Sequence, residues 1–223
     1  MSKSFTSRLT EIPSSMKKSL TLLFVCCFLF VAASLQAQMK FGPVAGLNLS
    51  KMTLKSSGIS FDPKTLIGFH FGALAEIPLS GSLVLQPAIL YSGKGSSYEI
   101  DFFEEPYEIK FAPGFIEVPV YAAYKFDLGS VKMFVKAGPY FAYGISGQVS
   151  DDEESYDICY GEGDDCDMKP FDFGLGFGAG VDLNGFIISL QYELGLMNLS
   201  PVDDAEMKIN VFGFSLADLF GKE

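Results

Sequence analysis

The sequence has 223 residues, a net charge of −11, 22 Phe, 10 Tyr, 23 Gly and no Trp. This length and composition suit one all-β domain. The acidic balance excludes a nucleic-acid partner, because phosphate binding needs clustered Lys and Arg and no such run occurs after the N-terminus. Apolar residues recur at a period of two rather than in a second long run, which is typical of membrane-spanning strands.

Residues 1–37 are predicted to be a cleaved signal peptide. Lys17 and Lys18 precede an apolar run at 20–33, and the small residues of SLQAQ follow it. This run is shorter than the roughly 20 residues that a spanning helix needs. Met16 is an alternative start of translation, because MKKSLTLLF begins a signal of ordinary length. The barrel domain is then residues 38–223.

Eight later segments alternate between apolar residues and small or polar ones, as strands with two different faces do. They lie at 41–50, 67–77, 83–92, 116–126, 131–143, 171–183, 186–196 and 208–220. Long connections at 51–64, 93–114, 146–170 and 197–207 alternate with short turns. Long external loops and short periplasmic turns are typical of outer-membrane barrels. Pro87 and Pro139 lie inside predicted strands, where a missing donor indicates a bulge or another irregularity.

Asn184-Gly185 separates two of these segments and predicts a two-residue type I′ hairpin turn. Leu183 then faces Phe186, and the register of the hairpin follows. One face holds only apolar pairs: Leu183/Phe186, Val181/Ile188, Ala179/Leu190, Phe177/Tyr192, Leu175/Leu194 and Phe173/Leu196. The other holds Asp182/Ile187, Gly180/Ser189, Gly178/Gln191, Gly176/Glu193 and Gly174/Gly195. Glycine on this crowded face leaves room for polar side chains from neighbouring strands, so the apolar face is predicted to meet lipid.

The predicted fold is therefore an all-β, eight-stranded antiparallel up-and-down transmembrane β-barrel in the outer membrane. Its last strand must close on its first, because lipid does not tolerate unpaired edges. The predicted interior polar network contains His70, Glu76, Glu117, Lys136, Asp182, Gln191 and Glu193. An interior of eight strands is just wide enough for side chains, which favours packed ion pairs over a pore. We expect Lys136 to be the counter-ion of Glu193.

The loop at 146–170 combines two cysteines with many acidic residues. Cys159 and Cys166 are predicted to form a disulfide, because they are an isolated pair in an exported chain. The candidate cation ligands are Asp151, Asp152, Glu153, Glu154, Asp164, Asp165 and Asp167. The alternative is a solvated loop kept apart from its neighbours by its own charge, and no spacing matches a known calcium loop.

Four segments resemble the PorT-like outer-membrane β-barrel family: KFGPVAGLNLSKM, LQPAILYSGKG, FIEVPVYAAYKF and ISLQYELGLMNLS. The resemblance covers residues 38–223 and implies an eight-stranded barrel in a Gram-negative outer membrane. Its founding type is linked to protein secretion, and its motifs carry no catalytic signature. This chain ends in Gly-Lys-Glu rather than on an aromatic residue, and Phe220 is the expected insertion signal.

These patterns predict a monomeric, non-enzymatic barrel without a cofactor. Its partners are outer-membrane lipid and an envelope or surface protein that meets the acidic loops, in a structural role, a surface interaction or as an accessory to secretion. One alternative is a lipid-acting barrel enzyme that uses His70, the single histidine. A narrow, porin-like pore is the other.

Overall fold

The computed structural model describes residues 39–56, 59–61, 63–102, 105–129, 131–151, 154–163, 165–202 and 205–221. The predicted signal peptide and its alternative start at Met16 lie outside them. Eight long strands are β1 (Lys40–Ser56), β3 (Lys64–Ser80), β4 (Leu83–Gly93), β6 (Glu105–Asp127), β7 (Lys132–Ser150), β9 (Phe171–Leu183), β10 (Phe186–Gly195) and β11 (Ala205–Asp218). Three short strands are β2 (Ile59–Phe61), β5 (Ser96–Phe102) and β8 (Ser155–Asp157). In the part of the chain described, no helix is long and apolar enough to cross a membrane.

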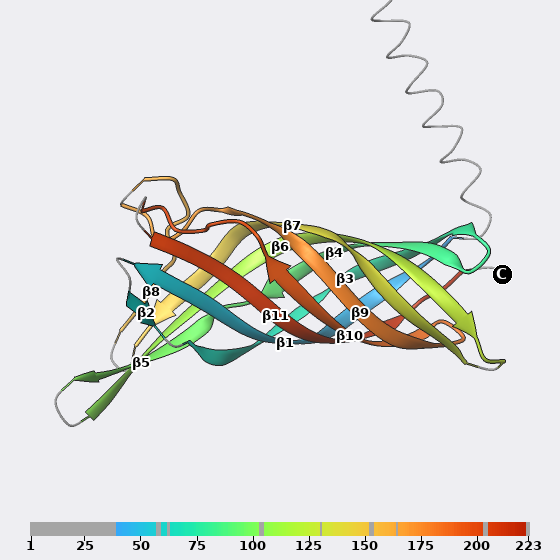
Figure 1. The fold of residues 1–223 in the computed structure, drawn as a ribbon, viewed down its shortest axis with the longest axis horizontal. Helices are drawn as coiled ribbons and strands as arrows, with labels where there is room; N and C mark the ends of the chain where they lie inside the picture. Colours follow the sequence, from blue (N-terminus) through green and yellow to red (C-terminus); the bar gives the residue numbers. More distant parts are fainter. Residues whose placement is uncertain are drawn as a thin grey trace, which may run out of the picture. The chain divides into compact units, whose positions relative to one another are not determined.

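The eight long strands of the described residues close into one antiparallel ring (Figure 1). Its order is β1, β11, β10, β9, β7, β6, β4, β3 and back to β1. The first and last strands pair from Val44↔Ala217 to Ser56↔Ala205, which confirms the predicted closure. Closure removes the free edges that the strands would otherwise present to lipid.

The β9–β10 hairpin has the predicted register. Leu183 pairs with Phe186, and the ladder continues to Gly174↔Gly195. Asn184 and Gly185 have φ of 58° and 105°, the positive values that the turn requires. Tyrosines from neighbouring strands occupy the space beside the inward glycines: a Cβ on Gly176 would lie 2.3 Å from the Tyr121 hydroxyl, and one on Gly174 would lie 2.5 Å from the Tyr140 ring. Both glycines are therefore required by tyrosines from neighbouring strands.

The strands are longer than the sequence pattern predicts, and the loops are correspondingly shorter. The prediction of a loop over 93–114 is wrong: β5 and β6 form a hairpin there, with Glu99↔Glu108 and Phe102↔Glu105 paired. β6 has 23 residues and β7 has 19, whereas about 9–11 tilted residues cross a bilayer. The alternation of apolar residues stops at the lipid boundary, because strands in water need no apolar outer face.

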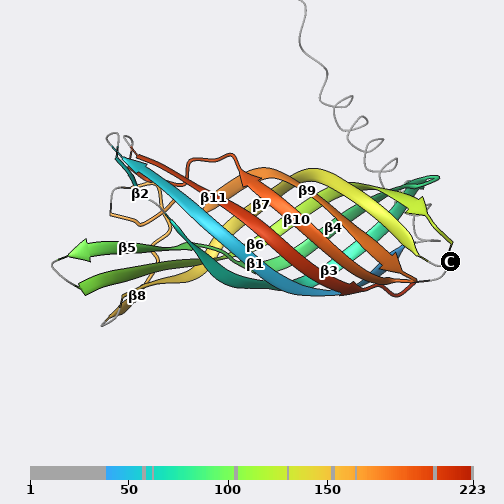
Figure 2. The same ribbon diagram turned by 60° about the horizontal axis from the view of Figure 1, so that its bottom comes forward.

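The long strand extensions all leave one end of the barrel. Figure 2 shows β2, β5 and β8 at the end opposite the C-terminus. The other end carries the turns at Gly81 and Asn184 and the bridge between Phe41 and Phe220. Because long connections of outer-membrane barrels are external and short turns are periplasmic, the end with the extensions is the extracellular one.

Three prolines interrupt three successive ladders in the wall. Pro87 lies in a gap of the β3–β4 ladder, Pro119 in a gap of the β4–β6 ladder and Pro139 in a gap of the β6–β7 ladder. Each proline lacks the N–H that the ladder needs. The register is the same on both sides of each gap, so the irregularity expected at Pro87 and Pro139 is present without a bulge. We call these three residues the proline seam.

The outer face is apolar, whereas the interior is layered rather than uniformly polar. Exposed apolar side chains follow the strands, among them Leu47, Ile67, Phe69, Ile89, Val135 and Phe214. Inside, one apolar cluster fills the extracellular end: Met52, Tyr98, Phe115, Tyr140, Ala142, Val149, Ile158, Met168, Leu199, Met207, Ile209 and Val211. A second contains Val44, Val84, Ala88, Leu90, Ala123, Phe134, Ile187, Ala217 and Leu219. The prediction of a packed polar interior is therefore correct only for the layers between and beside these clusters.

Candidate functional site

The charged centre of the barrel is built on Lys94, which directly follows β4. Its ammonium group forms ion pairs with Glu117 of β6 and with Glu193 of β10, the latter at 3.0 Å. All three side chains are almost completely buried. The Tyr121 hydroxyl donates to Glu193 at 3.1 Å. One cation therefore holds two carboxylates from different, non-adjacent strands of the wall.

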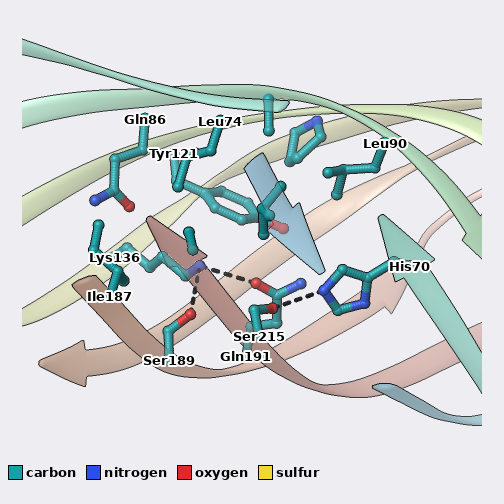
Figure 3. Close-up of a pocket in the computed structure, with 14 residues that line it drawn as sticks. His70, Leu74, Gln86, Leu90, Tyr121, Lys136, Ile187, Ser189, Gln191 and Ser215 are labelled. Atoms are coloured by element: carbon teal, nitrogen blue, oxygen red, sulfur yellow. Dashed lines mark hydrogen bonds between the residues drawn. The ribbon is translucent and has the colours of Figure 1, made fainter. Parts of the chain in front are cut away.

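Lys136 is not the counter-ion of Glu193, which corrects the prediction. Its Nζ donates to Gln191 Oε1 at 2.9 Å and contacts Ser189 Oγ at 3.5 Å (Figure 3). It also lies 5.1 Å from the centre of the Tyr121 ring. Lys94 is the counter-ion expected of Lys136. Its backbone N–H still donates to the Pro113 carbonyl of β6, so its side chain points into the lumen, as that of Ser92 does.

A second ionic cluster lies at the periplasmic end. Lys125 Nζ contacts Glu76 at 2.5 Å and Asp182 at 2.7 Å. Gln86 donates to the second oxygen of Glu76 at 3.0 Å. All these groups are largely buried. The carboxylates of Glu76 and Asp182 therefore have a cation between them, as buried charges require.

His70 lies in a buried chain of neutral polar groups. Its Nδ1 contacts Asn48 Oδ1 and its Nε2 contacts Ser215 Oγ, both at 2.8 Å. The Asn48 amide nitrogen donates to Ser92 Oγ at 3.1 Å and to the Gly93 carbonyl at 3.0 Å, which turns the amide oxygen toward His70. This network assigns the proton to Nδ1 and makes Nε2 the acceptor from Ser215.

A small cavity lies between His70 and Lys136. Figure 3 shows both side chains around it, with Gln86, Tyr121 and Ser189. Its volume is about 30 Å³. Such a volume with several polar partners suits ordered water rather than a lipid chain.

The loops at the extracellular end close the barrel. Ile158, Met168 and Leu199 are buried on the extracellular apolar cluster, and we call these three residues the extracellular cap. Cys159 and Cys166 are disulfide-bonded with their Cα atoms 4.8 Å apart, which confirms the predicted disulfide. The bond fixes the segment between the two buried cap residues Ile158 and Met168.

Among the described residues, the acidic candidates for cation binding do not converge. Asp151 accepts from the Glu154 amide at 2.7 Å, and Asp167 accepts from the Cys159 amide at 2.8 Å. Glu154 and Asp165 are exposed, and Asp152, Glu153 and Asp164 lie outside the described residues. Among the side chains that the structure describes, no group of three or more His, Cys, Asp or Glu is placed to hold a metal ion.

Several interior residues were missed in the sequence. Lys94 falls in the loop predicted at 93–114, and the predicted interior network does not contain Lys125. Asn48 and Ser215 lie 22 and 145 residues away from His70 in the sequence. Their inward positions follow from strand alternation and their neighbouring strands from the closure of the ring, but no local pattern indicates the register at which these side chains meet.

A closed ring with a lipid-facing apolar surface defines an integral outer-membrane β-barrel. Residues 34–200 match the family described as outer membrane protein beta-barrel domain. The chain belongs to this family, and the protein is located in the outer membrane, in contact with its lipid. No curated protein matches the sequence.

Three solved barrels are similar to this chain at low identity. Ail of Yersinia pestis, solved with the heparin analogue sucrose octasulfate, is 16% identical, with coverage of 82% of this chain and 99% of Ail and a TM-score of 0.38. Neisserial surface protein A is 13% identical, with coverage of 80% and 97% and a TM-score of 0.40. OprG of Pseudomonas aeruginosa is 8% identical, with coverage of 84% and 98% and a TM-score of 0.44.

Proposed function

We propose that the protein is a non-enzymatic barrel that presents a rigid extracellular platform to an envelope or surface protein. The observation that carries this proposal is the apolar cluster at the extracellular end of the barrel, where Tyr98, Met168 and Leu199 are packed together. If the strand extensions only connected the membrane-spanning segments, they would not need an apolar core of their own. A packed core instead holds a surface in one shape, which lowers the entropy cost of binding a partner.

The charge of this platform favours a basic partner. Glu154, Asp157, Glu162 and Asp165 are exposed around the disulfide segment. Their carboxylates raise the local concentration of a positively charged surface and favour its orientation. Two further parts of the proposal are residues 1–37 as the export signal and a monomeric barrel.

The test is crosslinking in native membranes with the full chain. One variant carries Glu154→Gln, Asp157→Asn, Glu162→Gln and Asp165→Asn. The control neutralises two exposed carboxylates near the other end of the barrel, Asp127→Asn and Asp218→Asn. We expect the crosslinked species to be lost in the first variant and retained in the control. Equal crosslinking in both variants contradicts the proposal.

The resemblance to PorT-like barrels supports a narrower form of this proposal, in which the partner belongs to a protein-secretion apparatus. A strain that lacks the chain should then retain secreted proteins inside the cell, and the wild-type chain should restore their export. If export is unchanged in the deletion strain, the partner belongs to another process.

The hydrogen-bonded chain of Ser215, His70 and Asn48 favours one rival, a lipid-acting enzyme. A serine that donates to a neutral histidine is the arrangement of an activated nucleophile. The cavity beside it, at about 30 Å³, does not accommodate an acyl chain. We expect wild type, Ser215→Ala and His70→Ala to leave outer-membrane lipids equally intact. Hydrolysis by wild type alone would establish the enzyme.

The packed lumen opposes the other rival, a narrow pore. The extracellular cap and the buried Lys94 cluster lie across the path that an ion would take. Liposomes with the purified barrel should therefore show no more ion leakage than empty liposomes.

A further inference from the structure

The outer wall formed by β1 and β11 carries a group of lysines at the extracellular end. Lys51 and Lys55 are exposed on β1, and Lys208 is partly exposed on β11. In the ladder, Lys51 pairs with Asn210, Thr53 with Lys208 and Lys55 with Glu206. The three ammonium groups therefore lie on one outward strip, which we call the basic strip.

The basic strip begins where the lipid-facing surface ends. The preceding outward pair on the same two strands is Leu49↔Phe212, followed toward the membrane centre by Leu47↔Phe214. All four of these side chains are exposed, as is Ile67 beside Leu49 on β3. The next outward pair toward the outside is Lys51↔Asn210. One continuous strip of wall thus changes from apolar to basic within a single pair.

The depth of this change matches the head-group layer. Two residues of strand rise about 7 Å, and each head-group layer is about 5–8 Å thick. A lysine beyond the last apolar pair also extends its ammonium group into this layer. Lys51 and Lys208 therefore reach the head groups of the outer leaflet.

The basic strip is positive in an acidic chain. Among the described residues of β1 and β11 at this end, the carboxylate beside the lysines is Glu206, which contacts Lys208 at 2.5 Å and Lys55 at 3.9 Å. The hydrogen bond from Lys208 lowers the pKa of Glu206, so this group stays ionised. These described residues, three lysines and one glutamate, sum to a charge of +2, opposite in sign to the −11 of the whole chain. A local excess of this kind selects an anionic partner.

We propose that the basic strip binds the phosphate-bearing head group of an outer-leaflet lipid, with the acyl chains of that lipid along Leu49, Phe212 and Ile67. Lys51 and Lys208 contact the phosphate, and the partly exposed side chains of Thr53 and Asn210 between them supply polar contacts to the head group. Such a lipid matches the surface of this wall, which is apolar toward the membrane centre and cationic toward the outside. The site does not depend on a protein partner of the extracellular platform.

The experiment measures lipid retention by native mass spectrometry of the full barrel released from nanodiscs. The discs contain phosphatidylcholine with either bisphosphorylated lipid A or the same lipid A after dephosphorylation. We expect wild type to retain the phosphorylated lipid. Lys51→Gln with Lys208→Gln should bind it about 30-fold more weakly, from the usual contribution of two juxtamembrane lysines.

The control, Lys110→Gln with Lys132→Gln, makes the same change of charge outside the basic strip. It should retain the phosphorylated lipid as wild type does, and an equal loss in both variants would overturn the proposal. Equal retention of the two lipids by wild type would also overturn it. That comparison decides the question even if a variant fails to fold, which its mobility on a gel before and after boiling reveals.

Discussion

At Lys94 a single ammonium group forms ion pairs with two carboxylates inside the barrel. Both Glu117 and Glu193 are within ion-pair distance of it, and neither is exposed to water. A buried charge without its partner is costly, because the protein interior replaces little of its lost hydration. Lys94 therefore contributes to the stability of the barrel, although the sequence places it in a predicted loop.

Lys94→Met should destabilise the barrel by about 3–5 kcal/mol, because it leaves the buried carboxylates without a counter-ion. Lys136→Met should cost less, because Lys136 contacts the neutral groups of Gln191 and Ser189. The measurement is the free energy of unfolding by urea in detergent micelles for both variants. If Lys136→Met is the more damaging change, Lys94 is not the main counter-ion.

Tyr98 predicts a dependence on alkaline pH. It lies in the extracellular extension, and its hydroxyl donates to the Met52 carbonyl at 2.5 Å. Burial raises its pKa from 10.0 to about 12. Because the unfolded tyrosine ionises first, the contribution of the neutral phenol is complete below pH 10 and is lost between pH 10 and 12.

We therefore expect wild type to be more stable than Tyr98→Phe at pH 9 by about 1 kcal/mol, the usual contribution of one hydrogen bond. By pH 11.5 this difference should shrink or reverse. Urea unfolding of both proteins at the two pH values measures it, and the other tyrosines cancel in the comparison. A difference that is constant with pH would show that Tyr98 does not ionise on unfolding in this range.

At the scale of strands, the β9–β10 hairpin and the β5–β6 hairpin show what a local pattern can predict. Asn184-Gly185 fixes a turn, and alternation on both sides of it fixes every pair of the register. Residues 93–114 lack this alternation of apolar and polar residues, because in water both faces of a strand accept polar residues. The sequence therefore indicates strands where lipid lies on one side, and it underestimates them beyond the membrane.

The proline seam predicts uneven protection of the wall. Pro87, Pro119 and Pro139 each remove a donor from a different ladder, whereas β1 and β11 pair without interruption from Val44 to Ser56. The amides of 118, 120, 121, 137 and 138 should therefore exchange hydrogen faster than those of 44–54, because fewer ladder bonds must open. Hydrogen exchange with mass spectrometry in micelles measures this. Uniform protection around the ring would show that the gaps do not weaken the wall.

At the scale of the whole molecule, the long strand extensions and the short turns give the two ends of the barrel different exposure. A cysteine introduced at Glu154 should react with a membrane-impermeant maleimide on intact cells, because it lies beside the extracellular cap. A cysteine at Gly81, in a turn of the other end, should react only after the outer membrane is permeabilised. Cys159 and Cys166 are already bonded to each other and give little background. Labelling of Gly81→Cys alone on intact cells would reverse the assigned orientation.

The sequence by itself determined the fold class, the closure of eight strands and the face that meets lipid. Each of these depends on the difference in polarity between adjacent residues. Because one side of every spanning strand meets lipid and the other meets the lumen, this difference recurs in all eight strands. Only the tertiary structure decided which charges meet. Lys94 reaches Glu117 of the next long strand and Glu193, 99 residues away. His70 reaches Asn48 of the preceding long strand and Ser215, 145 residues away. The reason is physical: the lumen brings together inward side chains from all eight strands, and their pairing depends on the stagger of the closed ring.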